Sequence, residues 1–81
     1  MNRDAIFMLL TKVFREVFDD DSVVAQEQLT ARDVPAWDSL SNIRMIVTAE
    51  EEFGISFSTD EITNLKNVGE FVDVIQRKLS R

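Results

Sequence analysis

The sequence contains neither cysteine nor histidine. These two absences exclude disulfide bonds, cysteine-containing zinc sites and thiol nucleophiles. They also exclude every catalytic arrangement that pairs serine or cysteine with histidine. If the chain takes part in chemistry, it must borrow the reactive group from elsewhere.

Proline occurs once and glycine twice, which favours helices over a β fold with many turns. Long apolar runs are missing as well. The longest, Ala5 to Leu10, has six residues, whereas a membrane span needs roughly 20. No signal-peptide cleavage pattern follows this run. We therefore expect a soluble, cytoplasmic protein without a membrane span.

The composition indicates a small acidic domain. The 81 residues suffice for one domain, predicted over residues 1–81. Asp and Glu number 15 against nine Lys and Arg, which gives a net charge of −6. Phosphate backbones repel such a chain, so basic protein surfaces, and not nucleic acids, are its expected partners.

The first half of the chain is predicted to hold one helix and one long loop. Apolar residues recur every three or four positions from Asn2 to Phe18, and Asn2 is a suitable N-cap for this helix. A loop follows from Asp19 to Asp38. Its expected anchors on the core are Leu29, Val34 and Trp37.

Three more helices are predicted after the loop. The second helix covers Ser39 to Phe53, and Gly54 follows as its C-terminal cap. A capping box at Ser58 predicts a short helix over residues 59–65, and an apolar stripe predicts the last helix over Val68 to Leu79. The expected fold is all-α: a small antiparallel four-helix bundle with three long helices, one short helix and a long first loop.

The second helix has more apolar residues than one buried face requires. At 100° per residue, its core face is predicted to hold Asn42, Met45, Ile46, Ala49 and Phe53. Leu40 and Val47 fall on another side, with Ile43 nearby and the charged Arg44 and Glu51 beside them. Two interpretations stay open: an exposed protein-docking strip, or a bundle that wraps far enough to bury these residues.

Asp38, Ser39 and Leu40 lie at the junction of the long loop and the second helix. Ser and Asp at such a junction are most often N-caps. The functional interpretation is that Ser39 carries a phosphodiester-linked group, whose phosphate would face the unpaired N–H groups of the helix start. Because no histidine can take its proton, Ser39 could only be an attachment point that another enzyme modifies.

The sequence resembles the acyl carrier protein family, whose members carry 4′-phosphopantetheine. The resemblance covers nearly the whole chain and rests on residues 37–40, residues 50–55 at the family spacing, and the pattern of the last helix. It implies that a phosphopantetheinyl transferase, with coenzyme A as donor, places 4′-phosphopantetheine on Ser39. It also implies that the arm's thiol holds an acyl or aminoacyl group as a thioester, which the protein shuttles between biosynthetic enzymes. On this interpretation the protein is a carrier and not an enzyme.

The same resemblance implies roles for further residues. Asp38 and Leu40 flank the attachment site and would meet the transferase. The implied partner-docking residues are Leu40, Arg44, Val47, Glu50, Glu51, Asp60 and Glu61. Arg44 stands where family members often carry an acid, so we expect a docking surface of mixed sign. The implied acyl-cleft residues, for each of which core packing is an alternative, are Ile43, Phe57, Ile62, Val68, Phe71 and Ile75.

The sequence leaves the cargo open among fatty acyl, polyketide and aminoacyl groups, and with it the loading ligase or transferase and the downstream enzymes. We expect a monomer. The alternative function is an unmodified acidic helical adaptor that binds a partner through the second helix. No metal site is expected: a calcium-binding loop from Asp19 fails because Val24 and Thr30 replace the required glycine and glutamate.

Overall fold

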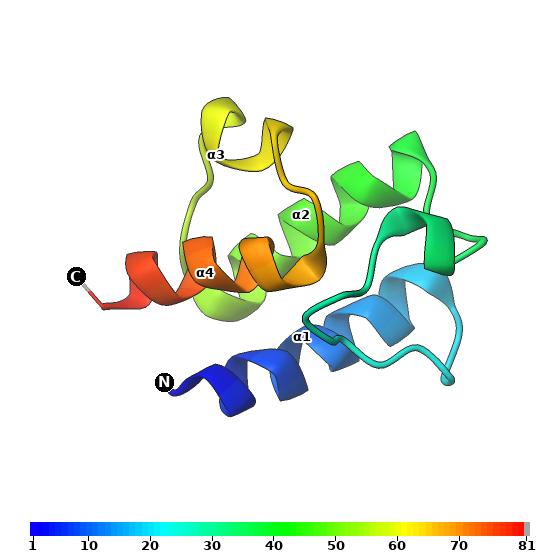
Figure 1. Ribbon diagram of the computed structural model, residues 1–81, viewed down its shortest axis with the longest axis horizontal. Helices are drawn as coiled ribbons and strands as arrows, with labels where there is room; N and C mark the ends of the chain where they lie inside the picture. Colours follow the sequence, from blue (N-terminus) through cyan, green and yellow to red (C-terminus); the bar gives the residue numbers. More distant parts are fainter. Residues whose placement is uncertain (81) are drawn as a thin grey trace.

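The computed structural model describes residues 1–80, and this part of the chain is all-helical. Its elements are α1 (Arg3–Phe18), the 3-10 helix η1 (Ala31–Asp33), α2 (Ser39–Phe53), α3 (Thr59–Thr63) and α4 (Val68–Leu79). In Figure 1, α1 runs opposite in direction to both α2 and α4, and the short α3 lies at the edge of this group. The prediction of an all-α fold with three long helices and one short helix is confirmed.

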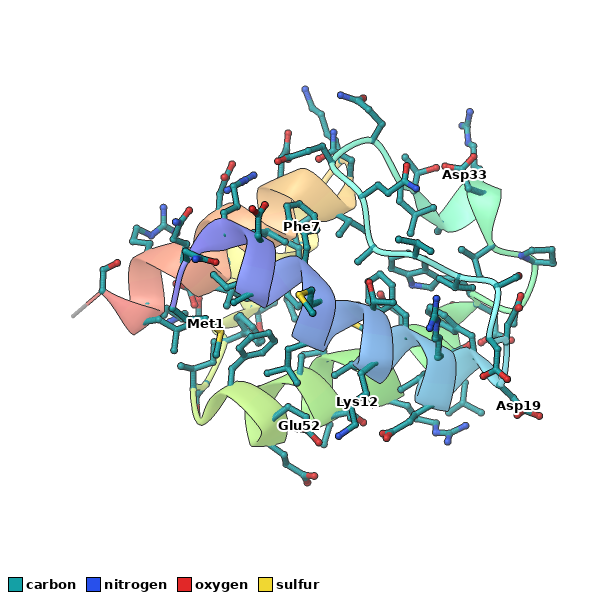
Figure 2. All side chains as sticks on the ribbon, turned by 90° about the horizontal axis from the view of Figure 1, so that it is seen from below. Met1, Phe7, Lys12, Asp19, Asp33 and Glu52 are labelled. Atoms are coloured by element: carbon teal, nitrogen blue, oxygen red, sulfur yellow. The ribbon has the colours of Figure 1, made fainter. Side chains whose placement is uncertain are left out.

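The core is built around α1, which packs against both α2 and α4. Figure 2 looks onto α1 and shows α2 and α4 on either side of it. Fully buried side chains come from α1 and α4, and α2 adds a smaller buried face: Ile6, Leu10, Val13, Phe14, Val72, Ile75, Met45, Ala49 and Phe53. None of the described helices is long and apolar enough to cross a membrane.

The helix ends follow local side-chain signals. The side-chain oxygens of Asn2 and Asn67 accept the backbone N–H three residues further on, at 2.8 and 3.0 Å, which caps α1 and α4. Ser58 forms the predicted capping box at the start of α3. Gly54 ends α2 in the left-handed region at φ 67°, as predicted, because glycine adopts this conformation without strain.

The third helix is shorter than predicted. It was expected over residues 59–65 but ends at Thr63, and Asn64 leaves the helical conformation at φ −105° and ψ 20°. The Lys66 N–H then donates to the Glu70 carboxylate at 3.0 Å instead of continuing a helical ladder. The prediction is wrong at this end because the chain turns early to reach the start of α4.

Side chains of α1 hold the first half of the long loop. Arg15 Nε donates to the Val23 carbonyl oxygen at 2.9 Å, and Thr11 Oγ1 accepts the Ala25 N–H at 2.9 Å. Val23 and Ala25 are themselves buried. These contacts give backbone groups of the loop defined partners on the bundle, which accounts for an ordered loop of this length.

The second half of the loop is anchored by the predicted residues. Val34 is buried, and Leu29 and Trp37 are partly buried against the core. The Trp37 ring lies 5.4 Å from the Phe14 ring and 5.2 Å from the Phe18 ring, measured between centroids. The predicted anchoring of the loop is confirmed, and the aromatic cluster adds to the burial.

Gly69 marks a close approach between α4 and the loop. The Val68 N–H donates to the Leu29 carbonyl oxygen at 2.9 Å, and the Gly69 N–H donates to that of Glu27 at 3.0 Å. A Cβ atom at Gly69 would lie 2.5 Å from Glu27 Oε1 and 2.9 Å from the Glu27 carbonyl oxygen. Glycine is therefore needed here because the loop backbone packs directly on the first turn of α4.

Candidate functional site

Ser39 is the first residue of α2 and its side chain is exposed. Within residues 1–80, its hydroxyl is not part of any side-chain hydrogen bond. The N-cap of α2 is instead Asp38, whose carboxylate accepts the Ser41 N–H at 2.9 Å. The capping role that a serine at a helix start often performs is thus taken by its neighbour, which leaves the Ser39 hydroxyl accessible.

Ser41 completes this cap and was not singled out from the sequence. Its buried hydroxyl oxygen accepts the Asp38 N–H at 3.2 Å and lies 2.7 Å from Asp38 Oδ1 and 2.6 Å from the Ala36 carbonyl oxygen. The backbone N–H and the hydroxyl of Ser41 hold the pKa of Asp38 below its usual range. Asp38 and Ser41 form a capping box with serine in the position where the common pattern has Glu or Gln, which is why the signal was missed.

Trp37 fixes the segment that leads into α2. Besides its contacts with Phe14 and Phe18, its Nε1 donates to Asn42 Oδ1 at 3.0 Å. Trp37 and Asn42 flank Ser39 on both sides in the chain. The backbone that presents Ser39 is therefore fixed to the core before and after the serine.

The apolar residues on the outer side of α2 are exposed. Leu40 is 69% exposed, Ile43 60% and Val47 46%; we call these three residues the α2 strip. Arg44 and Glu51, also exposed, lie on the same helix. The structure thus supports the exposed strip bordered by charge and contradicts the alternative in which the bundle buries it.

Two of the predicted docking carboxylates are engaged within the protein, and two others are exposed. Glu50 is half-buried, and its Oε2 accepts the Phe57 N–H at 2.8 Å, which ties α2 to the segment before α3. This bond gives the half-buried carboxylate a hydrogen-bond partner within the protein. Glu51 and Asp60 are exposed, as a docking role requires.

Glu61 is the second engaged carboxylate. Its Oε1 lies 2.8 Å from Lys78 Nζ and accepts the Ser58 N–H at 2.8 Å. The Lys78 ammonium, followed by the Ser58 N–H, lowers the pKa of Glu61 from 4.5 to about 2. The expectation that Glu61 extends an acidic surface is corrected, since Lys78 on α4 neutralises its charge.

A cleft of about 690 Å³ opens between the long loop, α2, α3 and the start of α4. Trp37 and Asn42, which flank Ser39, both line it. Three of the implied cleft residues, Ile62, Val68 and Phe71, line it too. The loop, α2 and the α3 region supply the rest of the wall: Leu29, Thr30, Ala31, Arg32, Met45, Ile46, Thr63, Leu65, Lys66 and Asn67.

Three other implied cleft residues lie elsewhere. Ile43 belongs to the exposed α2 strip. Ile75 is fully buried in the core. Phe57 packs on Phe71 with ring centroids 5.1 Å apart, and it is not part of the cleft wall. None of these three residues lines the cleft: Ile43 is exposed, and Phe57 and Ile75 follow the core-packing alternative. Their positions in the sequence do not show which neighbours the side chains contact.

A comparison with protein families shows the general class to which this protein belongs. Residues 37–75 match the family model described as a phosphopantetheine attachment site. This segment begins at Trp37 and includes Ser39, α2, α3 and most of α4. The class is therefore that of proteins with a covalently attached 4′-phosphopantetheine.

Relatives that match nearly the whole chain show the family to which this protein belongs. The acyl carrier protein of Acidothermus cellulolyticus is 35% identical over 75 residues, which cover 93% of this chain and 89% of that protein. The acyl carrier protein of Thermosynechococcus vestitus is 37% identical over 76 residues, which cover 89% and 93%. The solution NMR structure of holo acyl carrier protein from Geobacter metallireducens superposes with a TM-score of 0.88 at 45% identity, and covers 94% of this chain and 87% of that one.

The chain belongs to the acyl carrier protein family. Members of this family are carriers and not enzymes, as the carrier interpretation predicted. Membership also implies interaction with a phosphopantetheinyl transferase and with biosynthetic enzymes.

The residues at the start of α2 fit a 4′-phosphopantetheine group. The Ser39 oxygen is exposed and has no competing bond among the described residues. The first turn of the 15-residue helix α2 supplies backbone N–H groups and a positive dipole end, which favour a phosphate. The adjoining cleft offers apolar walls to whatever is attached.

Proposed function

We propose that Ser39 is the residue that carries 4′-phosphopantetheine through a phosphodiester bond. The observation that supports this most directly is the division of roles at the helix start: Asp38 caps α2, and the Ser39 hydroxyl is exposed and unbonded within residues 1–80. A serine in this position is available to a modifying enzyme without loss of the cap. Asp38 and Leu40, on either side, meet the transferase.

Once attached, the group supplies a terminal thiol that holds an acyl or aminoacyl cargo as a thioester. The protein presents this cargo to successive biosynthetic enzymes, in fatty-acid, polyketide or other specialised biosynthesis. Its own residues provide a fixed base for the arm, because Trp37 and Asn42 hold the backbone around Ser39. A carrier that visits several enzymes in turn works most simply as a monomer in the cytoplasm.

The α2 strip is the proposed docking surface for these enzymes. Leu40, Ile43 and Val47 offer apolar contact, while Arg44 and Glu51 set orientation. Exposed charge pairs of this kind steer association and add little affinity, which suits a carrier that must also leave. Since Arg44 is cationic, the partner surface is expected to place an acid opposite it.

The test is enzymatic modification followed by intact-mass measurement. With a phosphopantetheinyl transferase and coenzyme A, the wild-type protein should gain the mass of one arm, and the Ser39→Ala variant should gain none. Ser56→Ala is the matched control, since Ser56 is also exposed but lies outside the site. If the wild type gains no mass with several transferases, the unmodified adaptor is favoured. If the Ser39→Ala variant gains the mass of an arm, the attachment residue is not Ser39.

The chemical identity of the cargo would show in which biosynthetic pathway the protein works. Protein isolated from its native host should carry an arm whose added mass distinguishes a fatty acyl, a polyketide or an aminoacyl group. If the protein isolated from a host that contains the transferase is entirely unmodified, the carrier function is contradicted.

A further inference from the structure

The charge of the cleft differs from that of the whole protein. Its wall, as far as residues 1–80 form it, includes Arg32 and Lys66 and no aspartate or glutamate. The chain as a whole has 15 acidic residues against nine basic ones. A cleft with two cations and no acid is therefore unexpected on a protein of net charge −6, and it points to an anionic occupant.

The two cations have no acidic partner within the described chain. Arg32 comes from η1 and Lys66 from the segment between α3 and α4, and neither takes part in a salt bridge there. The acids nearest in sequence are bonded to backbone groups: Asp33 accepts the Thr30 N–H at 2.9 Å, and Glu70 accepts the Lys66 N–H at 3.0 Å. Both cationic side chains are exposed and available to a ligand.

The rest of the cleft wall is mostly apolar. Its larger apolar side chains come from the loop, from the three helices that border the cleft and from the segment between α3 and α4: Leu29, Trp37, Met45, Ile46, Ile62, Leu65, Val68 and Phe71. A hydrocarbon segment would be sheltered by these residues. A purely hydrocarbon cargo, however, would make no charged contact with Arg32 or Lys66.

We propose that the cleft receives an acyl cargo that ends in a carboxylate, with the methylene chain on the apolar wall and the carboxylate bound by Arg32 and Lys66. The proposal rests on the proposed function of Ser39 as the attachment residue. Trp37 and Asn42 line the cleft and flank Ser39 in the chain, so cargo on the arm has direct access. Guanidinium and ammonium groups both form charge-assisted hydrogen bonds with carboxylates.

The test compares adipyl and hexanoyl cargo, which have equal chain length and differ in the terminal carboxylate. A phosphopantetheinyl transferase loads each arm from the corresponding acyl-coenzyme A, and intact mass confirms one arm per chain. Hydrogen exchange is then measured by NMR for the backbone amides of residues 63–68. We expect exchange to be slowed roughly two- to tenfold more by adipyl than by hexanoyl, the range given by two partly exposed charge pairs.

Charge-neutral variants show whether the cleft cations cause this preference. Arg32→Gln combined with Lys66→Gln should remove the difference between the two cargoes and leave hexanoyl unchanged. The matched control is Lys12→Gln combined with Arg77→Gln, which removes the same charges at exposed positions outside the cleft wall. This control should keep the adipyl preference, and added salt should weaken the preference in the wild type.

The outcomes separate this inference from the proposed function. If no arm is attached to Ser39, the proposed function itself fails. If both cargoes are loaded and protect the cleft amides equally, the carrier function stands and the inference is overturned. An adipyl preference that survives in the Arg32 and Lys66 variant would also overturn it, because another group would then bind the carboxylate.

Discussion

The guanidinium of Arg3 forms a bidentate ion pair with the carboxylate of Glu27, and both nitrogen–oxygen distances are 2.8 Å. Its remaining terminal nitrogen donates to Asp73 at 2.7 Å, so one side chain joins the start of α1 to the long loop and to α4. Glu27 precedes the loop residues that form one wall of the cleft, among them Leu29 and Arg32. This contact lies outside the cleft and holds the loop just before the residues of the cleft wall.

Replacing Arg3 by lysine should lower the melting temperature, because one ammonium cannot bond both Glu27 and Asp73 in this planar geometry. Glu27→Gln should lower it as well. In a double-mutant cycle the two changes should be less than additive, since either one breaks the same pair. Additive effects would show that the Arg3–Glu27 pair does not couple α1 to the loop.

Gly69→Ala should destabilise the protein by about 1–3 kcal/mol, the range for overpacking. In an exposed helix interior the same change stabilises by about 1 kcal/mol. The sign reverses here because the new Cβ would lie 2.9 Å from the Glu27 carbonyl oxygen, which belongs to the backbone and cannot simply rotate away. Urea unfolding measures the difference, and a more stable Gly69→Ala variant would refute the close approach.

Acid should weaken the junction between α3 and α4. The folded-state pKa of Glu61 is lowered from 4.5 to about 2, so its stabilising contribution is complete above pH 4.5 and is lost as the pH falls toward 2. The Glu61→Gln variant should therefore lose less stability over this pH range than the wild type. Unfolding curves between pH 2 and pH 6 test this, with the exposed Glu52→Gln as control. Parallel pH profiles for wild type and Glu61→Gln would contradict the assignment.

Arg44→Glu should reduce affinity for the dedicated partner enzyme by about two- to tenfold, mainly through slower association at low salt. Arg44 is exposed beside the apolar residues of the α2 strip, so the new carboxylate would repel the acid that we expect opposite it. Surface plasmon resonance with the partner measures the change. Arg77→Glu changes an exposed residue of α4 and controls for the change in net charge. If Arg44→Glu leaves the affinity unchanged, the prediction of a docking surface of mixed sign is contradicted.

The helix limits were predictable because their signals are local. Asn2, Ser58 and Asn67 bond to backbone N–H groups three residues away, and Gly54 stops α2 through its own φ. Each signal can be recognised in a short window of sequence. The one wrong limit, at Thr63, lies where the chain bonds to a residue of the next helix.

The cleft and the loop contacts could not be predicted in the same way. Arg3 and Glu27 are 24 positions apart in the sequence. Gly69 is still further from Glu27 in the sequence, yet the two residues approach closely in the fold. Helical angles correctly separated Ile43 and the rest of the α2 strip from Ile46 and the core face. They could not show that the strip is exposed or that Ile46 lines a cleft. That distinction depends on where the loop and α3 pack, which only the assembled fold provides.

Peptide mapping of the modified protein tests the central claim most directly. After reaction with a phosphopantetheinyl transferase and coenzyme A, tandem mass spectrometry of the proteolytic fragments should place the whole added mass on Ser39. An added mass on Ser41, Ser56 or any other residue, or an unmodified fragment around residue 39 under conditions that modify a known carrier, would contradict the claim.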